Sequence, residues 1–427
     1  AFVSKPTFDP NLFVEGIDSK TWDELNNSPD KPLLDRPLHG TYPPGSTYKP
    51  FMALAALTLH KRTASWGFQD PGHFTLGNHT FRDDNPNGHG WIDMQASIVH
   101  SCDTYYYMLA NDLGVDAIHD FMKPFGFGQL TGIDINGESR GILPSTEWKR
   151  SAYRKVALQK WYDGETISLG IGQGYNSFTI LQLANAEAIL ANDGVAMKPH
   201  LVKAMEDPLT HRRTPLESGQ SYRIPLRQAD IDVVKRAMVA VTHAGTAAKV
   251  FAGAQYESGG KTGTAQTFSL QRNQKYVSHA VAETKRDHAL YTAFAPAEHP
   301  TIALALIVEN GGWGGEAAPP IARKLLDYYL LKQWPKDLAE PAVELQARAQ
   351  GSDDDAEEPV TQAGVARKEA GAGDDGVQNA STPTLEDRVR DTLTHRPEAA
   401  PQKKNPESAT TGLPHKLMTQ QHSATHA

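Results

Sequence analysis

The chain has 427 residues, enough for one large hydrophobic core or for a domain with extensions. Its net charge of -8 argues against a nucleic-acid-binding protein, and its single cysteine excludes an internal disulfide framework. The sequence has no apolar run of about 18 residues, so it contains no predicted membrane span.

The first segment with distinctive chemistry is residues 42–57. Ser46 and Lys49 are spaced to share one face of a helix, and the Pro-Pro-Gly of residues 43–45 predicts that Ser46 lies at or near its start. Pro50 fits the first helical turn, where no N–H bond is lost. A hydroxyl with an amine one turn further along is a candidate activated nucleophile. Taken alone, the pattern favours a helix-capping serine and a solvated first-turn lysine, because it is short.

Residues 70–102 contain side chains of the kinds that bind metal ions. A cysteine, a histidine and two carboxylates can close a tetrahedral zinc site with no open position for water. The candidate ligands are Asp70, Asp83, His89 and Cys102, and the nearest competitors are Asp84, His73 and His79. On spacing alone, a polar surface loop beside a buried free thiol is the favoured interpretation.

Two further segments place polar residues at the edge of apolar runs. Ser101 and Asp103 open an apolar stretch that predicts a helix ending at Gly114. Residues 261–266 follow two glycines and predict a strand, in which Gly263 marks a close approach of another group to the backbone.

The remaining elements follow from periodicity. Residues 180–190 predict an amphipathic helix that is ended by residues 192–194. Residues 289–295 and 301–308 predict strands that form an antiparallel meander with the strand of Lys261. Residues 322–331, beyond two prolines, predict an amphipathic helix that covers one face of the sheet.

The composition changes near residue 337. Charged residues, Ala, Gly, Gln and Pro replace aromatic and β-branched residues, and such a segment cannot bury enough apolar surface to offset the entropy lost on ordering. The sequence therefore predicts a folded domain over residues 1–336 and a disordered tail over residues 337–427. A role of the tail in interactions is the alternative.

The motifs, taken in order, are typical of one superfamily. Ser46-x-x-Lys49, Ser101-x-Asp103 and the Lys-Thr-Gly that starts at Lys261 resemble the signature set of penicillin-binding proteins and serine β-lactamases. The chain up to about residue 335 resembles the transpeptidase domain of the penicillin-binding protein 2 family. The segments that carry this resemblance are residues 1–13, 42–47, 101–105, 170–175 and 261–266. Asp103, where division-specific relatives usually have Asn, favours the elongation type.

The resemblance implies an α/β fold of the penicillin-binding protein and serine β-lactamase kind, with an antiparallel sheet flanked by helices and a helical subdomain. It also implies a peptidoglycan D,D-transpeptidase that cross-links stem peptides in cell-wall elongation and reacts with β-lactams.

In the cross-linking reaction implied by the resemblance, Ser46 attacks the penultimate D-alanine and Lys49 is the base. An ordinary lysine has a pKa of about 10.4, so the base role needs a pKa lower by roughly three units. Ser101 and Asp103 would relay protons and hold Lys49, and the charge of Lys261 would lower the pKa of Lys49.

The same resemblance assigns the substrate contacts. The backbone N–H groups of Ser46 and Thr264 would form the oxyanion hole. The hydroxyls of Thr262 and Thr264, on either side of Gly263, would bind the terminal carboxylate of the substrate.

The resemblance also changes the interpretation of the metal ligands. Several members of the family bind zinc through Asp, Asp, His and Cys in this region, so one structural zinc per chain is expected at Asp70, Asp83, His89 and Cys102.

Family members have a short cytoplasmic tail, one membrane helix and a non-catalytic domain ahead of the transpeptidase domain. The chain is therefore expected to be a fragment, the periplasmic domain of a protein anchored in the bacterial inner membrane. Its expected partners are a membrane glycosyltransferase and rod-shape scaffold proteins.

Three other functions stay open at this stage. A serine β-lactamase would need a base that activates water for deacylation, and a penicillin-sensing binding domain would stay acylated. The third, a non-catalytic scaffold, is disfavoured because all the motifs are intact.

Overall fold

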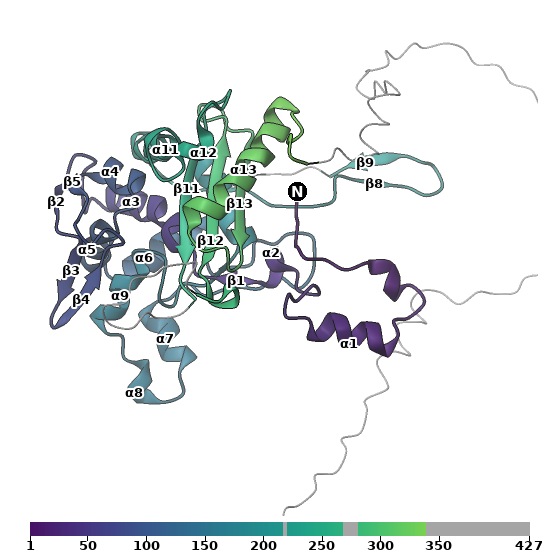
Figure 1. Ribbon diagram of the computed structural model, residues 1–427, viewed down its shortest axis with the longest axis horizontal. Coiled ribbons are helices and arrows are strands. Elements are labelled where there is room, and N and C mark those ends of the chain that lie inside the picture. The colour runs from purple at the N-terminus through teal and green to yellow at the C-terminus, as the bar shows by residue number, and fades with distance from the viewer. Residues whose placement is uncertain (217–219, 268–280, 339–427) are drawn as a thin grey trace, which may run out of the picture. The chain divides into compact units, whose positions relative to one another are not determined.

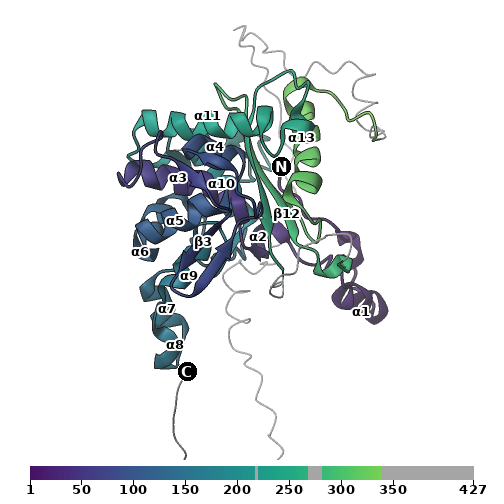
Figure 2. The ribbon, with the colours of Figure 1, turned by 60° about the vertical axis from the view of Figure 1, so that its left-hand side comes forward.

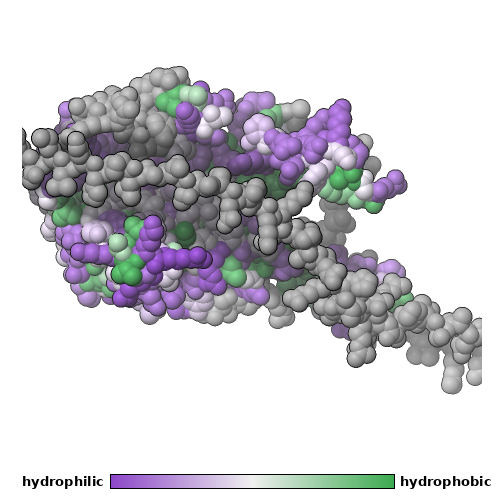
Figure 3. Space-filling model, turned by 90° about the horizontal axis from the view of Figure 1, so that it is seen from below, coloured by the Kyte–Doolittle hydropathy of each residue, from purple (hydrophilic) through white to green (hydrophobic). Residues whose placement is uncertain are grey.

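The structure is a computed structural model that describes residues 1–216, 220–267 and 281–338. These residues belong to one compact unit, residues 1–351. The tail predicted over residues 337–427 lies, beyond Leu338, outside the described residues. None of the described helices is both long and apolar enough to cross a membrane. The face seen from below is mainly hydrophilic, with hydrophobic residues in small groups (Figure 3).

The central element is an antiparallel sheet in the order β11-β12-β13 (Figure 1). Its strands are β11 (Gly259–Ala265), β12 (His288–Ala295) and β13 (Ile302–Val308). This confirms the predicted meander. In the register of the first pair, Lys261 lies opposite Thr292.

Helices cover both faces of this sheet. The helix α10 (Ile180–Ala191) packs against β12 and β13, α11 (Gln228–Ala244) packs against β11, and α13 (Gly314–Leu331) packs against β12. Figure 2 shows α10 and the helical part of the molecule on one side of the sheet and α13 on the other. The expected α/β fold is therefore confirmed.

The predicted start of the last helix was wrong. The helix α13 begins at Gly314 and includes Pro319 and Pro320, whereas the prolines were expected to precede it. Neither proline can donate to the carbonyl one turn before it, a defect that sequence rules treat as a helix boundary. Packing of α13 on β12 and β11 outweighs this defect, because a helix is stabilised mainly by the face that it buries.

The helical part is built around α3 (Lys49–Thr58), whose residues 49–57 are all buried. Its neighbours include α5 (Asp103–Leu113), which ends as predicted before Gly114 at a positive φ of 78°. The helix α10 starts at a capping box of Thr179 and Gln182 and ends at Asn192.

The other helices are short. They are α1 (Ser19–Asn27), α2 (Arg36–His39), α4 (Met94–Val99), α6 (Val115–Met122), α7 (Thr146–Ala152), α8 (Val156–Gln159), α9 (Asp163–Leu169) and α12 (Ala248–Phe251), with 3-10 turns η1 (Pro10–Phe13), η2 (Gly45–Tyr48), η3 (Lys123–Phe125) and η5 (Glu283–Lys285).

The remaining strands form two-stranded antiparallel pairs. They are β1 (Thr41–Tyr42) with β6 (Phe178–Thr179), β2 (Phe68–Asp70) with β5 (Gly90–Ile92), β3 (His73–Leu76) with β4 (His79–Arg82), β7 (Val195–Met197) with β10 (Gln220–Arg223), and β8 (Ala204–Glu206) with β9 (Arg213–Pro215).

Candidate active site and adjoining metal-ligand cluster

Ser46 lies in the 3-10 turn η2, which leads directly into α3 at Lys49. The predicted position at a helix start is thus correct, and Pro50 is in the first turn as expected. Gly45 has a positive φ of 54°, and a Cβ on it would lie 2.5 Å from the carbonyl oxygen of Thr264. The turn of Ser46 can therefore lie close against β11 only because residue 45 is glycine.

Lys49 is fully buried and reaches the second motif. Its Nζ donates to Ser101 O at 2.5 Å, to Ser101 Oγ at 3.1 Å and to Asp103 Oδ1 at 2.5 Å. These bonds occupy the donors of the ammonium group. Among the described residues no hydrogen bond joins Lys49 Nζ to Ser46 Oγ. Hydrogen bonds between catalytic groups are often long or poorly aligned in the absence of substrate.

Lys261 enters the same site from β11 and is also fully buried. Its Nζ donates to Ser101 Oγ at 2.9 Å and to Thr262 O at 3.1 Å. Burial, and then the charge of Lys49, lower the pKa of Lys261 well below its usual value. The sequence predicted that Lys261 would act on Lys49. The repulsion is mutual, and in the structure it contributes to the low pKa of Lys261.

Asp103 balances these charges. Burial raises the pKa of Asp103, while the neighbouring Lys49 opposes that rise. Ser101 has a positive φ of 60°, which is uncommon for a residue other than glycine. The strained turn places the hydroxyl of Ser101 between Lys49 and Lys261. The four residues therefore form one connected polar cluster beside Ser46.

The predicted substrate-binding hydroxyls lie on β11. Thr262 Oγ1 is 2.7 Å from Thr246 Oγ1, and Thr264 Oγ1 accepts from the backbone N–H of Gly314 at 3.1 Å. The carbonyl of Thr264 accepts from Gln173 Nε2 at 2.9 Å. The sequence analysis assigned no role to Thr246, Gln173 or Gly314. Gln173 lies in the glycine-rich segment of residues 170–174, and this segment was the sequence signal that could have identified it.

Gly263 has the close neighbours that the sequence predicted. A Cβ on it would lie 2.8 Å from Thr47 Cγ2 and 3.0 Å from Pro44 O, next to the turn of Ser46. On Gly314, a Cβ would lie 1.9 Å from Gly263 O. The backbone of β11 is thus packed between the Ser46 turn and the start of α13.

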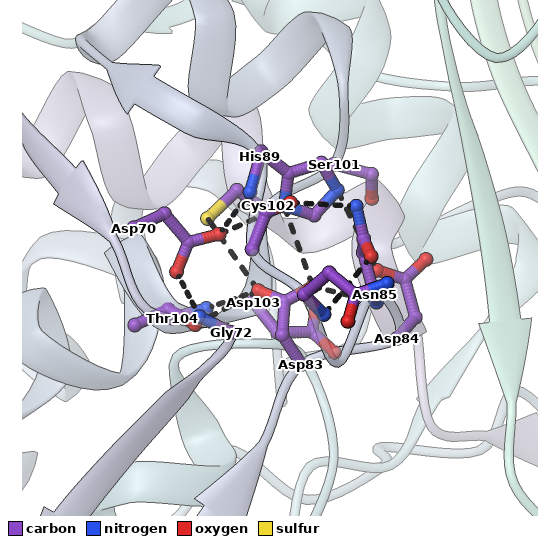
Figure 4. Close-up of polar contacts among 12 residues, drawn as sticks. Asp70, Gly72, Asp83, Asp84, Asn85, His89, Ser101, Cys102, Asp103 and Thr104 are labelled. Carbon is purple, nitrogen blue, oxygen red and sulfur yellow. Dashed lines mark hydrogen bonds and ion pairs between the residues drawn. The ribbon is translucent and has the colours of Figure 1, made fainter.

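The predicted metal ligands come together beside this site. Asp70 ends β2, Asp83 follows β4, His89 precedes β5 and Cys102 precedes α5. One candidate ligand atom from each lies within 4.8 Å of all the others. Figure 4 shows their side chains pointing toward one another.

The distances between ligand atoms suit a tetrahedral ion. His89 Nδ1 is 2.9 Å from Asp70 Oδ2 and 3.6 Å from Asp83 Oδ1. Cys102 Sγ is 3.4 Å from Asp70 Oδ2 and 3.5 Å from Asp83 Oδ2. Tetrahedral zinc with bonds of about 2.0–2.3 Å separates its ligands by about 3.3–3.8 Å. The four side chains therefore need only small adjustments to fit a zinc ion, among them the choice of one oxygen of Asp83, since Oδ1 faces His89 and Oδ2 faces Cys102.

Backbone groups hold the two carboxylates in place. Asp70 Oδ1 accepts from Gly72 N at 2.9 Å, and Asp83 Oδ2 accepts from Thr104 N at 2.8 Å. Because Asp103 lies between Cys102 and Thr104, the metal-ligand cluster is directly connected to the second motif.

The competing side chains lie outside this cluster. Asp84 is half-exposed, and its Oδ1 is 3.8 Å from Nε2 of His89, the ring nitrogen remote from the cluster. The exposed His73 bonds to Pro71 O, and His79 packs against Phe81. The geometry thus selects Asp70 and Asp83 as the carboxylates.

Comparisons with known proteins identify the family. The family described as "Penicillin binding protein transpeptidase domain" matches residues 1–327. Among curated proteins, the peptidoglycan D,D-transpeptidase MrdA of Haemophilus influenzae is 42% identical over 348 residues, which are 79% of this chain and 52% of that protein. The chain therefore spans about half the length of this relative.

Solved structures resemble the chain over a similar range. Pseudomonas aeruginosa PBP2 in complex with WCK 5153 is 43% identical, with a TM-score of 0.68 over 79% of this chain and 73% of that one. Helicobacter pylori PBP2 in complex with MreC is 28% identical, with a TM-score of 0.65 over 78% and 58%. A structure described as a peptidoglycan synthase complex that coordinates polymerization and crosslinking is 29% identical, with a TM-score of 0.66 over 79% and 54%.

Proposed function

This chain belongs to the transpeptidase family of penicillin-binding proteins, and we propose that it cross-links peptidoglycan stem peptides through an acyl-enzyme on Ser46. The observation that carries this proposal is the connected cluster of Lys49, Ser101, Asp103 and Lys261 beside the Ser46 turn. Its similarity to penicillin-binding protein 2 structures over most of the chain supports the elongation type.

The reaction has two acyl transfers. Ser46 Oγ attacks the carbonyl carbon of the penultimate D-alanine, its proton passes to Lys49, and the peptide bond to the terminal D-alanine breaks. The leaving amine receives a proton through Ser101. The amine of a second stem peptide then attacks the ester, and Ser46 regains its proton. The backbone N–H groups of Ser46 and Thr264 stabilise the oxyanion in both steps.

Labelling with a fluorescent penicillin tests the nucleophile. We expect one label per chain on Ser46, stable for many minutes, and none in Ser46→Ala. The matched control Ser65→Ala changes an exposed serine and should label like the wild type. Labelling that survives in Ser46→Ala would remove Ser46 from this role.

The fate of the label separates the alternatives. Rapid loss of label with turnover of the penicillin would indicate a β-lactamase, in which water attacks the ester. Stable labelling with no cross-linking of stem peptides would indicate a penicillin sensor. A transpeptidase labels stably and also joins stem peptides.

We also propose that Asp70, Asp83, His89 and Cys102 hold a structural zinc ion. The support is the fit of their ligand atoms to a tetrahedral ion and the burial of both carboxylates and the thiol. Such an ion would tie the β2–β5 region to the start of α5, and no step of the acyl transfer passes through it.

The partners are proposed from the related structures. The structure of H. pylori PBP2 with MreC supports a rod-shape scaffold protein as partner, and the peptidoglycan synthase complex supports a membrane glycosyltransferase. Both proposals, and a periplasmic location, concern the whole protein to which this domain corresponds.

A further inference from the structure

Glu187 on α10 is a buried acid that the proposed reaction does not use. Its side chain is completely buried, and neither carboxylate oxygen has a hydrogen-bond partner among the described residues. Fully buried acids are rare in proteins unless they are paired. The helix α10 lies on the side of the sheet opposite α13, together with the helices that carry the active site (Figure 2).

One polar group beside Glu187 belongs to the active-site sheet, on the strand β12 that packs against α10. The hydroxyl of Thr292 on β12 acts on the Glu187 carboxyl and favours its charged form. Thr292 is itself buried, and its hydroxyl completes no hydrogen bond within the described part of the chain. Thr292 also lies directly opposite Lys261 in the β11–β12 register, so the two side chains share a face of the sheet. Glu187 is therefore on a helix that packs against the strand carrying the cross-strand partner of Lys261.

No cation of the described elements around α10 pairs with Glu187. The strands β6, β7 and β13 carry no charged side chain. Lys235 of α11 bonds to Asp193 and to the carbonyl of Ala191.

The other charged groups around α10 are engaged or exposed. Arg36 of α2 bonds to Glu309, and Lys123 of the 3-10 turn η3 is exposed. His39 of α2 is exposed, and His288 at the start of β12 accepts from the backbone N–H of Asn310 at 2.9 Å. Tyr291 of β12 packs on Phe251, and its hydroxyl has no partner among the described residues.

Burial without a cation keeps the acid protonated. Burial raises the pKa of Glu187 to about 8, although Thr292 opposes the rise. At neutral pH the group is an uncharged carboxylic acid. Its ionisation would place an unpaired charge between α10 and β12, and the packing there would have to change to solvate it.

We propose that Glu187 is a positioning residue for the acyl transfer: as an uncharged acid it lets α10 pack on β12, and a charge at this position displaces Lys261, the cross-strand partner of Thr292, from Ser101. The residue acts through Thr292 and Lys261 and does not contact the substrate. This inference rests on the proposed function, because its readout is acylation of Ser46.

The test compares the pH dependence of acylation in the wild type and in Glu187→Gln. The second-order rate of penicillin acylation is measured from pH 6 to pH 9.5. Gln keeps the shape of the side chain but cannot ionise, while every other ionisable group of the site is the same in both proteins. The ratio of wild-type rate to variant rate should fall about tenfold between pH 7 and pH 9, as expected for one group with a pKa near 8.

Two further variants make the test specific. Thr292→Val removes the group that favours the charged form of Glu187, so the fall should move to higher pH. Glu298→Gln changes an exposed acid in the turn between β12 and β13 and should leave the profile unchanged.

A constant ratio across this pH range would overturn the inference, even if Glu187→Gln changed the melting temperature. Absence of acylation in the wild type at every pH would instead overturn the proposed function. The two failures are therefore distinguishable.

Discussion

Ser101 is the residue through which the two lysines of the site interact. Its hydroxyl accepts from Lys261 and from Lys49, while Asp103 holds the other side of Lys49. Lys49 must be an uncharged amine to accept the proton of Ser46, because a protonated ammonium group has no lone pair. Burial lowers the pKa of Lys261, and the neighbouring charge of Lys49 lowers it further.

Substitution of each lysine by arginine separates their roles. Lys49→Arg should slow acylation by at least about 100-fold, because arginine stays protonated and cannot act as a general base. Lys261→Arg should have a smaller effect, because an arginine can still donate to Ser101 Oγ. The second-order rate of penicillin acylation measures both effects, with the melting temperature as the check on folding. Acylation by a folded Lys49→Arg protein at the wild-type rate would show that Lys49 is only structural.

At the scale of single elements, the sequence correctly predicted the helix ends that are set by the residues next to them. Gly114 ends α5 and the Asn192 turn ends α10, both where the sequence placed them. The start of α13 depends instead on a contact distant in sequence, the approach of Gly314 to Gly263 O. No local rule contains that contact, and the two prolines pointed to a later start.

Glu187 is a second case in which a contact between residues distant in sequence could not be predicted. It lies between Leu183 and Leu190 on the buried face of α10, so an acid within an apolar stripe was visible in the sequence. Its neighbour Thr292 comes from a strand that is remote in sequence, and only the fold brings the two together. The metal ligands are an intermediate case: the resemblance named all four, and the fold was needed to choose between Asp83 and Asp84.

The metal-ligand cluster connects four elements, β2, β4, β5 and α5, and its loss should affect all of them. We expect one zinc ion per chain by elemental analysis of metal-replete protein. Cys102→Ser should lose the ion and several degrees of melting temperature, because the β2–β5 region would no longer be tied to α5. His79→Ala, which changes a histidine outside the cluster, is the control and should keep the zinc. Metal-free protein with unchanged stability would contradict the zinc proposal and leave the transpeptidase proposal intact.

At the scale of the whole molecule, the sheet and its covering helices enclose the buried lysines and acids on which the site depends. Each buried ionisable group makes the stability of the fold depend on pH. Carboxyls with a lowered pKa, such as Glu309, stabilise the fold above the pKa of the unfolded chain. Glu187 acts in the opposite direction, since its pKa is raised.

The contribution of Glu187 to stability should therefore decrease as pH rises. Its pKa is about 8 in the folded protein against 4.5 for the ordinary group, so between these values only the folded chain holds the proton. Each pH unit in that interval lowers the free energy of unfolding by about 1.4 kcal/mol, about 5 kcal/mol in all. Below pH 4.5 both states are protonated and nothing is lost, and above pH 8 the loss is complete.

Glu187→Gln removes this dependence and leaves all other titrating groups in place. Urea unfolding followed by tryptophan fluorescence at pH 5, 6, 7 and 8 should show the variant gaining stability on the wild type by roughly 1 kcal/mol per pH unit. The gain should be smallest at pH 5, where the wild type has lost little. A difference between the two proteins that does not change with pH would mean that Glu187 is charged in the folded chain. Such a charge would need a partner that the packing of α10 on β12 does not provide.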